Sequence, residues 1–392
     1  MLTLIKNGEI FAPEPLGKKD VLIAGDRIGA LTDPGLIQIE GTQVSEIEAE
    51  GKLIFPGIID THVHLIGGGG EGGPATRTPE ILIEDIVSSG VTTIIGCLGT
   101  DGITRHPASL LAKARALEEE GITAFIFSGS YEIPPVTLTG SIRSDLVLID
   151  KVIGAGEIAI SDHRSSQPTF EDLARLAAEC RVGGMLSGKA GILHLHLGDG
   201  ERKLDMLFRL FKETEIPPSQ LVTTHINRNS DLFKEGIKYL KQGGQVDITV
   251  TDKDDELNME KAVKHLLNQN VPLNQITASS DGNGSLPVFD NKGNLLGLNV
   301  SNQKALLKSF QSLVKNDIMP SETAISFFTS NPASIYKLDR KGRIEPGKDA
   351  DLIILNRELE LTYVLAKGRL LLEDGNLIAR GTFSPKGGIS TP

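Results

Sequence analysis

Residues 53–65, LIFPGIIDTHVHL, contain the pattern that decides the fold of this chain. The stretch is a nearly continuous apolar run, which is typical of a parallel strand buried on both faces, and it ends in two histidines. His62 and His64 are two positions apart, so on an extended strand both imidazoles face the same side. The first expectation is therefore a buried strand that carries polar groups to its carboxyl end.

Seven later stretches repeat this pattern and alternate with helical segments. Apolar strands that alternate with helices predict a parallel sheet covered by helices, and eight such units in roughly 280 residues match a (β/α)8 TIM barrel of the α/β class. A doubly wound open sheet is the alternative, but no Gly-x-Gly-x-x-Gly follows an early strand. The predicted strands are 53–65, 91–99, 124–130, 157–163, 192–198, 221–226, 245–250 and 276–282.

The two ends of the chain differ from this middle part. Both consist of short β-type runs separated by Gly-centred turns, as in LTLIKNGEIF at the start and LTYVLAKGRLLLEDG near the end. We expect both ends to build one small β-sandwich. The predicted domains are a small β domain of residues 1–54 and 342–392 and a TIM barrel of residues 55–341.

Composition excludes several classes of function. Acidic residues outnumber basic ones by 51 to 40, and the net charge of -11 argues against nucleic acid and anionic membranes as partners. No stretch reaches the roughly 18 uncharged apolar residues of a membrane span, and the start lacks an apolar signal core, so we expect a cytoplasmic protein. Cys97 and Cys180 form no paired framework, so any metal is expected to use histidines and carboxylates.

Polar residues stand where the strand candidates end, which is where the active site of a TIM barrel lies. This set suits one or two borderline ions such as Zn²⁺, and it consists of His62, His64, His196, His225 and Asp281. His194 faces the same side as His196 and is expected in a lower layer of the core, because His196 lies nearer the carboxyl end of the strand. Metal ions that activate water, together with Asp281 as a proton shuttle, predict a metal-dependent hydrolase.

With these features the chain resembles the amidohydrolase superfamily, which also shares the closing GRIEPGKDADLIIL. The segments LIGGGGEGGPATRTPE, LGTDGITRHPASLLAK, AISDHRSSQP, THINRN and SSDGNGS resemble more closely the bacterial isoaspartyl dipeptidase family. The resemblance covers essentially the whole chain. It implies two zinc ions, a homo-oligomer, and hydrolysis of β-aspartyl dipeptides by metal-bound hydroxide with Asp281 protonating the leaving amine.

The resemblance assigns the zinc ligands, with His62, His64 and Asp281 on one ion and His196 and His225 on the other. The family's bridging ligand is a carbamylated lysine, and the matching position here is Glu157. Both groups end in a two-oxygen anion, but glutamate reaches roughly 3 to 4 Å less far. The segment VIGAGEIAI is one residue longer than in the family, and we expect the extra residue to advance the backbone. The ion count stays open between one and two.

A β-aspartyl dipeptide carries two carboxylates and one α-ammonium group around its isopeptide bond. Arg164 and Arg228 follow the fourth and sixth strands, and guanidinium groups bind carboxylates through paired hydrogen bonds. The resemblance adds further substrate contacts, namely Glu71 to the ammonium group, Tyr131 to the developing oxyanion, and Thr100 and Ser285.

Two alternatives remain. A glutamate in the fourth strand also resembles the deacetylase branch, so the protein could be another amidohydrolase acting on a cyclic amide or an N-acyl compound; the two arginines and Glu71 argue against this. The second alternative is a non-catalytic member of the superfamily, and the filled ligand positions argue against it.

Overall fold

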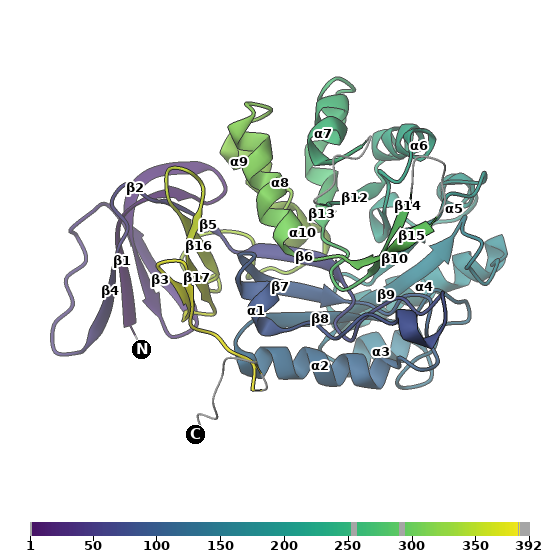
Figure 1. Ribbon diagram of the computed structural model, residues 1–392, viewed down its shortest axis with the longest axis horizontal. Coiled ribbons are helices and arrows are strands. Elements are labelled where there is room, and N and C mark those ends of the chain that lie inside the picture. Colours follow the sequence, from purple (N-terminus) through teal and green to yellow (C-terminus); the bar gives the residue numbers. More distant parts are fainter. Residues whose placement is uncertain (1, 252–256, 290–294, 383, 385–392) are drawn as a thin grey trace.

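The computed structural model describes residues 2–251, 257–289, 295–382 and 384. Within these residues the chain forms a barrel of parallel strands surrounded by helices and an additional sheet built from both chain ends (Figure 1). The predicted TIM barrel with a β part from both termini is confirmed. None of the helices in the described residues combines the length and the apolar composition needed to cross a bilayer.

In the described chain, the barrel sheet consists of eight strands in sequence order, all parallel to their neighbours. A bridge between Val63 and Gly282 and hydrogen bonds from Ser280 to the Asp60 carboxylate join the last strand to the first. The strands are β6 (Ile58–Val63), β7 (Val91–Gly96), β8 (Thr123–Ser128), β9 (Val152–Ile160), β10 (Ile192–Leu197), β11 (Leu221–Thr224), β12 (Gln245–Thr249) and β13 (Ile276–Ser279).

Two of these strands begin five residues away from the predicted start. The first candidate is not one strand, because β5 (Leu53–Pro56) pairs in the terminal sheet and only β6 enters the barrel. Gly57 lies between them, where an added Cβ would approach the Thr92 side chain to 2.2 Å. The fourth strand begins five residues earlier than predicted, at Val152, because Val152 already pairs with Ile126 of β8 and Gly154 with Ile192 of β10.

The helices cover the outside of the barrel (Figure 1). α4 shows how the sequence sets a helix boundary, because Thr169 and Asp172 form a capping box and Gly188 ends the helix in a left-handed conformation. The helices are α1 (Ile83–Val87), α2 (Pro107–Glu120), α3 (Ile142–Leu148), α4 (Phe170–Ser187), α5 (Asp205–Glu213), α6 (Ser230–Lys241), α7 (Met259–Leu267), α8 (Lys304–Lys315), α9 (Ser321–Ser326) and α10 (Ser330–Ile335), with 3-10 turns η1 (Pro74–Thr76), η2 (Pro218–Gln220) and η3 (Leu273–Gln275).

The terminal sheet joins the first and last parts of the chain, because β5 pairs with both β1 and β16. Part of its buried apolar side chains form a core of their own, whereas others, such as Phe55, Ile353 and Val364, pack into the core that contains the barrel residues. Its strands are β1 (Leu2–Phe11), β2 (Pro15–Ala24), β3 (Arg27–Thr32), β4 (Val44–Glu48), β5, β16 (Leu352–Leu355), β17 (Leu361–Ala366), β18 (Arg369–Glu373) and β19 (Asn376–Leu377). A separate hairpin, β14 (Ser285–Phe289) with β15 (Leu295–Val300), follows the last barrel strand.

A buried carboxylate holds several barrel strands together. Asp247 on β12 accepts hydrogen bonds from Thr61 at 3.1 Å and Thr277 at 2.6 Å on one oxygen, and from Thr224 at 2.9 Å and Ser279 at 2.5 Å on the other. These hydroxyls come from β6, β11 and β13. Burial raises the pKa of Asp247 above its usual value, although the hydroxyl donors partly oppose the shift.

Candidate metal centre

Glu157 reaches the centre of the barrel rim through an irregularity in β9. Leu193 and Leu195 of β10 pair with Ala155 and Ile158 of β9, so two steps along β10 match three steps along β9. The extra residue forms a β-bulge, which changes the direction in which the neighbouring side chains point. The register shift lies at Gly156 and Glu157, and the Glu157 side chain is 1% exposed.

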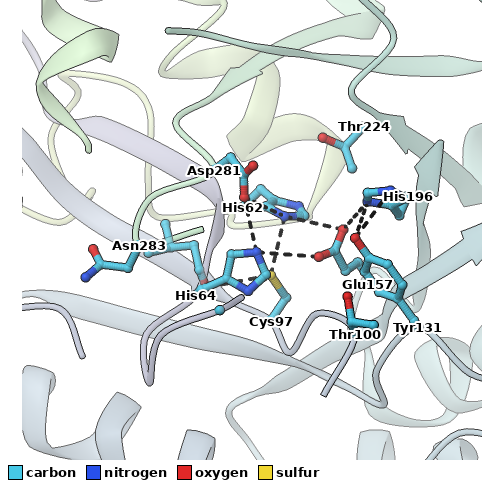
Figure 2. A network of polar contacts seen from close by, with 12 residues as sticks. His62, His64, Cys97, Thr100, Tyr131, Glu157, His196, Thr224, Asp281 and Asn283 are labelled. Carbon is cyan, nitrogen blue, oxygen red and sulfur yellow. Dashed lines mark hydrogen bonds and ion pairs between the residues drawn. The ribbon is translucent and has the colours of Figure 1, made fainter. Parts of the chain in front are cut away.

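The first strand and the last strand meet Glu157 at this point (Figure 2). The Nε2 atom of His64 lies 3.5 Å from Glu157 Oε1 and 3.1 Å from Asp281 Oδ1. The Nε2 atom of His62 lies 3.5 Å from Glu157 Oε2 and 3.6 Å from Asp281 Oδ1. The Sγ atom of Cys97, just past the end of β7, joins them at 3.6 Å from His62 Nε2.

The Glu157 carboxylate also approaches the histidines at the ends of the fifth and sixth strands. Glu157 Oε2 lies 3.0 Å from His196 Nδ1 and 3.7 Å from His225 Nε2. His225 and Asp281 both leave their strands in left-handed conformations, with φ of 61° and 51°. Such backbone is uncommon for residues other than glycine and concentrates at functional sites.

These donors form two groups with metal-ligand spacing. One atom each from His62, His64, Cys97 and Glu157 lie within 4.8 Å of one another, and so do atoms from Glu157, His196 and His225. Imidazole, carboxylate and thiolate are the ligands that divalent ions such as zinc take in proteins. The residues fit a divalent metal site, and Glu157 belongs to both groups.

A chain of hydrogen bonds below the rim orients His62. Its Nδ1 lies 2.8 Å from His194 Nε2, and His194 Nδ1 lies 3.2 Å from the Tyr336 hydroxyl. Burial and the neighbouring His62 hold the pKa of His194 well below its usual value, so its ring is neutral. The contact with His194 through Nδ1 leaves Nε2 of His62 facing the donor group. His194 is a buried core residue as predicted, and it also contacts a candidate ligand.

The second group is oriented in the same way. His225 Nδ1 lies 2.7 Å from the Thr249 hydroxyl, which leaves Nε2 facing Glu157. Asp162 Oδ2 lies 3.0 Å from His196 Nε2, opposite the nitrogen that faces Glu157. Hydrogen bonds to the outer nitrogen are typical of histidines that bind metals, because they fix the tautomer and the ring.

The surroundings of Asp281 and Tyr131 shift the pKa values of these two groups in opposite directions. Burial opposes ionisation of Asp281, but its hydrogen bond with His64 and the nearby imidazoles outweigh burial and lower its pKa. Burial and the charge of Glu157 raise the pKa of Tyr131 well above its usual value. Asp281 is therefore a carboxylate that accepts protons, whereas Tyr131 keeps its hydroxyl hydrogen and can donate it.

The predicted substrate-binding residues lie beside the two groups. Arg164 donates to both oxygens of Asp162, from Nε at 3.0 Å and from Nη2 at 2.7 Å, and its Nη1 lies 3.3 Å from Glu71 Oε1. Thr100 donates to Glu71 at 2.7 Å. Burial opposes the charge of Arg164, but its bond to Asp162 outweighs burial and raises the pKa. Arg164, Glu71 and Thr100 thus form one polar network.

The remaining three predicted residues are at the same rim. The Tyr131 hydroxyl lies 2.9 Å from His196 Nδ1, and Arg228 Nη2 lies 3.5 Å from His196 Nε2. Ser285 begins β14, and its Cβ is 3.2 Å from where a Cβ on Gly69 would lie. The structure places Ser285 against the glycine-rich loop at residues 67–70.

Sequence reasoning missed Cys97, Asp162 and the orienting role of His194. Cys97 was set aside because it forms no cysteine pair, although it ends a barrel strand as the histidines do. Asp162 stands in the segment AISDHR beside Arg164, so its position past the fourth strand was the available signal. His194 could not be separated from His196 by the period of the strand.

Comparison with known proteins agrees with this geometry. The model of the Amidohydrolase family matches residues 188–371. A crystal structure of beta-aspartyl dipeptidase from Fervidobacterium islandicum AW-1 in complex with beta-Asp-Leu dipeptide is 46% identical, has a TM-score of 0.91, and matches 96% of this chain and 97% of that chain. A second structure of beta-aspartyl dipeptidase from this organism is 43% identical, with a TM-score of 0.89 and coverage of 96% and 98%.

More distant relatives have other activities. A dihydroorotase of Lactobacillus acidophilus is 25% identical over 92% of this chain and 91% of its own length. An adenine deaminase of Halalkalibacterium halodurans is 23% identical over 97% of this chain, which spans 59% of that enzyme's length. Because identity is far higher and coverage nearly complete with the dipeptidase, the chain belongs to the beta-aspartyl dipeptidase family of the amidohydrolase superfamily.

Proposed function

We propose that this protein is a metal-dependent dipeptidase that hydrolyses the isopeptide bond of β-aspartyl dipeptides. The observation that carries the proposal is the pair of donor groups that share Glu157, with the cationic Arg164 and the anionic Glu71 beside them. The similar dipeptidase was crystallised with beta-Asp-Leu dipeptide, which supports this class of substrate.

We propose zinc as the metal, with two ions per chain. The ligands would be His62, His64, Glu157 and Asp281 at one position and Glu157, His196 and His225 at the other. Imidazole and carboxylate suit Zn²⁺, and a carboxylate shared by two groups suits a bridge. When bound, such ions polarise a carbonyl group and lower the pKa of water, which makes it a nucleophile near neutral pH.

The chain's own residues supply the proton transfers. Asp281 is held as a carboxylate by His64, so it can accept a proton from the attacking water and give it to the departing amine. The Tyr131 hydroxyl stays protonated and can donate a hydrogen bond to the oxygen of the cleaved carbonyl group as negative charge develops there.

Charge complementarity explains the preference for this substrate. Arg164 and Arg228 would bind the two carboxylates, and Glu71 would bind the α-ammonium group, with Thr100 and Ser285 as further polar contacts. Arg164 contacts Glu71, so the site presents a positive and a negative group side by side. A carboxylate and the ammonium group of the substrate would face these two groups. A cyclic amide or an N-acyl compound lacks the ammonium group that Glu71 would recognise.

A direct test compares hydrolysis of β-Asp-Leu and α-Asp-Leu by the zinc-loaded protein. We expect cleavage of the β-isomer alone, and a loss of at least about 100-fold in kcat for Asp281→Asn, the low end for removal of an acid–base group. Asp317→Asn is a matched control, because Asp317 is exposed and has the same φ of 51°. Equal cleavage of the two isomers, or of neither, would contradict the proposal.

We also propose that the enzyme is a homo-oligomer, as the resemblance implies, and that it works in the cytoplasm, as expected from the lack of long apolar stretches in the sequence. Sedimentation velocity of the zinc-loaded protein tests the assembly, since a species with the mass of one chain would contradict it. The domain limits at residues 54/55 and 341/342 remain a prediction, and limited proteolysis at these junctions tests them.

A further inference from the structure

Cys97 occupies a ligand position within the first donor group. It is the first residue after β7, and its side chain is fully buried. The Sγ atom lies 3.6 Å from His62 Nε2 and 4.0 Å from His64 Nδ1 (Figure 2). The sequence had predicted a metal site of histidines and carboxylates only, so a sulfur atom at this point is a departure from that expectation.

The distance between His62 and Cys97 matches that between two ligands of a tetrahedral zinc ion. A Zn–N distance of about 2.1 Å and a Zn–S distance of about 2.3 Å put nitrogen and sulfur about 3.6 Å apart at a tetrahedral angle, and two N or O ligands about 3.4 Å apart. The observed distance from His62 Nε2 to Cys97 Sγ is 3.6 Å. The Nε2 atoms of His62 and His64 each lie 3.5 Å from Glu157, the first from Oε2 and the second from Oε1.

An independent observation indicates that this cluster is arranged for an ion. The Nδ1 atom of His62 contacts His194, so Nε2 is the nitrogen that faces Cys97 and Glu157. All four side chains of the group are buried, with exposed fractions of 0% for His62, 5% for His64, 0% for Cys97 and 1% for Glu157. Buried nitrogen, oxygen and sulfur donors that converge on one point are what a metal cation requires.

We propose that Cys97 is a metal ligand and completes a four-donor set with His62, His64 and Glu157. As the sulfur–metal bond forms, the thiol proton passes to solvent. Four protein ligands close a tetrahedral site, whereas the group of Glu157, His196 and His225 has three and keeps a position open. In this set Cys97 takes the place of Asp281 in the ligand set proposed above, so the Asp281 carboxylate would serve proton transfer alone.

The competing explanation is a structural cysteine. The Sγ atom is also 3.7 Å from the Val63 carbonyl oxygen, to which a thiol can donate a weak hydrogen bond. A thiol in that role forms no bond to an added ion, so spectroscopy of the metal separates the two explanations.

The experiment loads the full-length protein with Co²⁺ and records its absorption spectrum. A thiolate ligand gives a near-ultraviolet sulfur-to-cobalt charge-transfer band, which we expect in the wild type and in Cys180→Ala and expect to be lost in Cys97→Ser. Cys180 is the matched control, because it is the other cysteine of the chain and is also buried. A wild type without this band, or a Cys97→Ser variant that retains it, would overturn the proposal.

A second measurement covers the case in which Cys97→Ser does not fold. In zinc-loaded Cys180→Ala, Cys97 is the sole cysteine, and X-ray absorption should show a sulfur neighbour at about 2.3 Å from zinc. A zinc coordination shell that contains only nitrogen and oxygen atoms would show that Cys97 is not a ligand. The inference rests on the metal-dependent function proposed above, but both measurements read the metal–sulfur bond, so they fail independently of the dipeptide assay.

Discussion

The Nδ1 atom of His62 lies 2.8 Å from Nε2 of His194, which joins a candidate ligand to the layer of the barrel below it. We predict that His194→Phe weakens metal binding about 10- to 100-fold, the usual cost of losing a partner of a metal-bound histidine. Phenylalanine fills the space, because the ring already stacks on Phe127. Titration against a chelator measures the affinity, and His265→Phe, on an exposed part of α7, is the control. Unchanged affinity would show that His194 is only a core residue.

The carboxylate of Glu157 belongs to the glutamate side chain itself and requires no modification. A carbamylated lysine must instead acquire its carboxylate from dissolved carbon dioxide. We predict that protein stripped of metal regains full activity with Zn²⁺ in buffer free of carbon dioxide, and that Glu157→Gln binds fewer ions per chain. Assays of recovered activity with and without bicarbonate measure the first effect, and elemental analysis measures the second. A requirement for bicarbonate would contradict the prediction.

Arg164 is predicted to bind a substrate carboxylate. Hydrogen bonds to charged groups contribute roughly 1.5 to 3 kcal/mol, so Arg164→Lys should raise KM for β-Asp-Leu about 10- to 100-fold and change kcat less. Lysine keeps the charge near Asp162 but loses the paired geometry. Steady-state kinetics at constant zinc content give both constants, and Arg202→Lys, which changes an exposed arginine, is the control. A loss confined to kcat would place Arg164 in another role.

Asp247 is predicted to stabilise the closed barrel. Asp247→Ala leaves four buried hydroxyl groups without their acceptor and should cost about 3 kcal/mol or more, whereas Asp247→Asn should cost less because hydroxyls can rotate to accept from an amide. Urea denaturation of the two variants compares them. Equal stability of the alanine variant and the wild type would contradict this role.

We predict that the buried thiol of Cys180 lowers the free energy of unfolding at high pH. Burial raises the pKa of its thiol from 9.0 to about 12. The unfolded chain therefore ionises first, and the stability that is present below pH 9 is lost as the pH rises toward 12. At pH 10 the loss is about 1.4 kcal/mol in the wild type and is absent in Cys180→Ala. Urea denaturation at pH 7.5 and 10 measures this difference, and parallel changes in both proteins would contradict it.

The fold could be predicted because the physical signals are local and repeated. Apolar runs such as 221–226 and 245–250 alternate with helices, and this pattern indicates a parallel barrel whatever the connections between strands. The break at Gly57 could not be predicted, since it depends on Thr92, which approaches from the neighbouring strand. Long-range packing of this kind leaves no periodic signal in the sequence.

The candidate site was predictable where a residue type and a strand end coincide, as for His62 and Asp281. Residues that act through a second side chain carry no such signal. Asp162 is recognised as a site residue only from its contacts with Arg164 and His196. Cys97 is recognised only from the position of its sulfur atom. These depend on three-dimensional distances between strands.

The shared position of Glu157 has a thermodynamic consequence. One carboxylate cannot give its full negative charge to two cations at once, yet the first cation also fixes its orientation for the second. Occupancy of one position must therefore change the affinity of the other, and by linkage the factor is the same in both directions. Stepwise titration with zinc should accordingly give a cooperative or anticooperative isotherm, with the sign set by whichever of these two effects is larger.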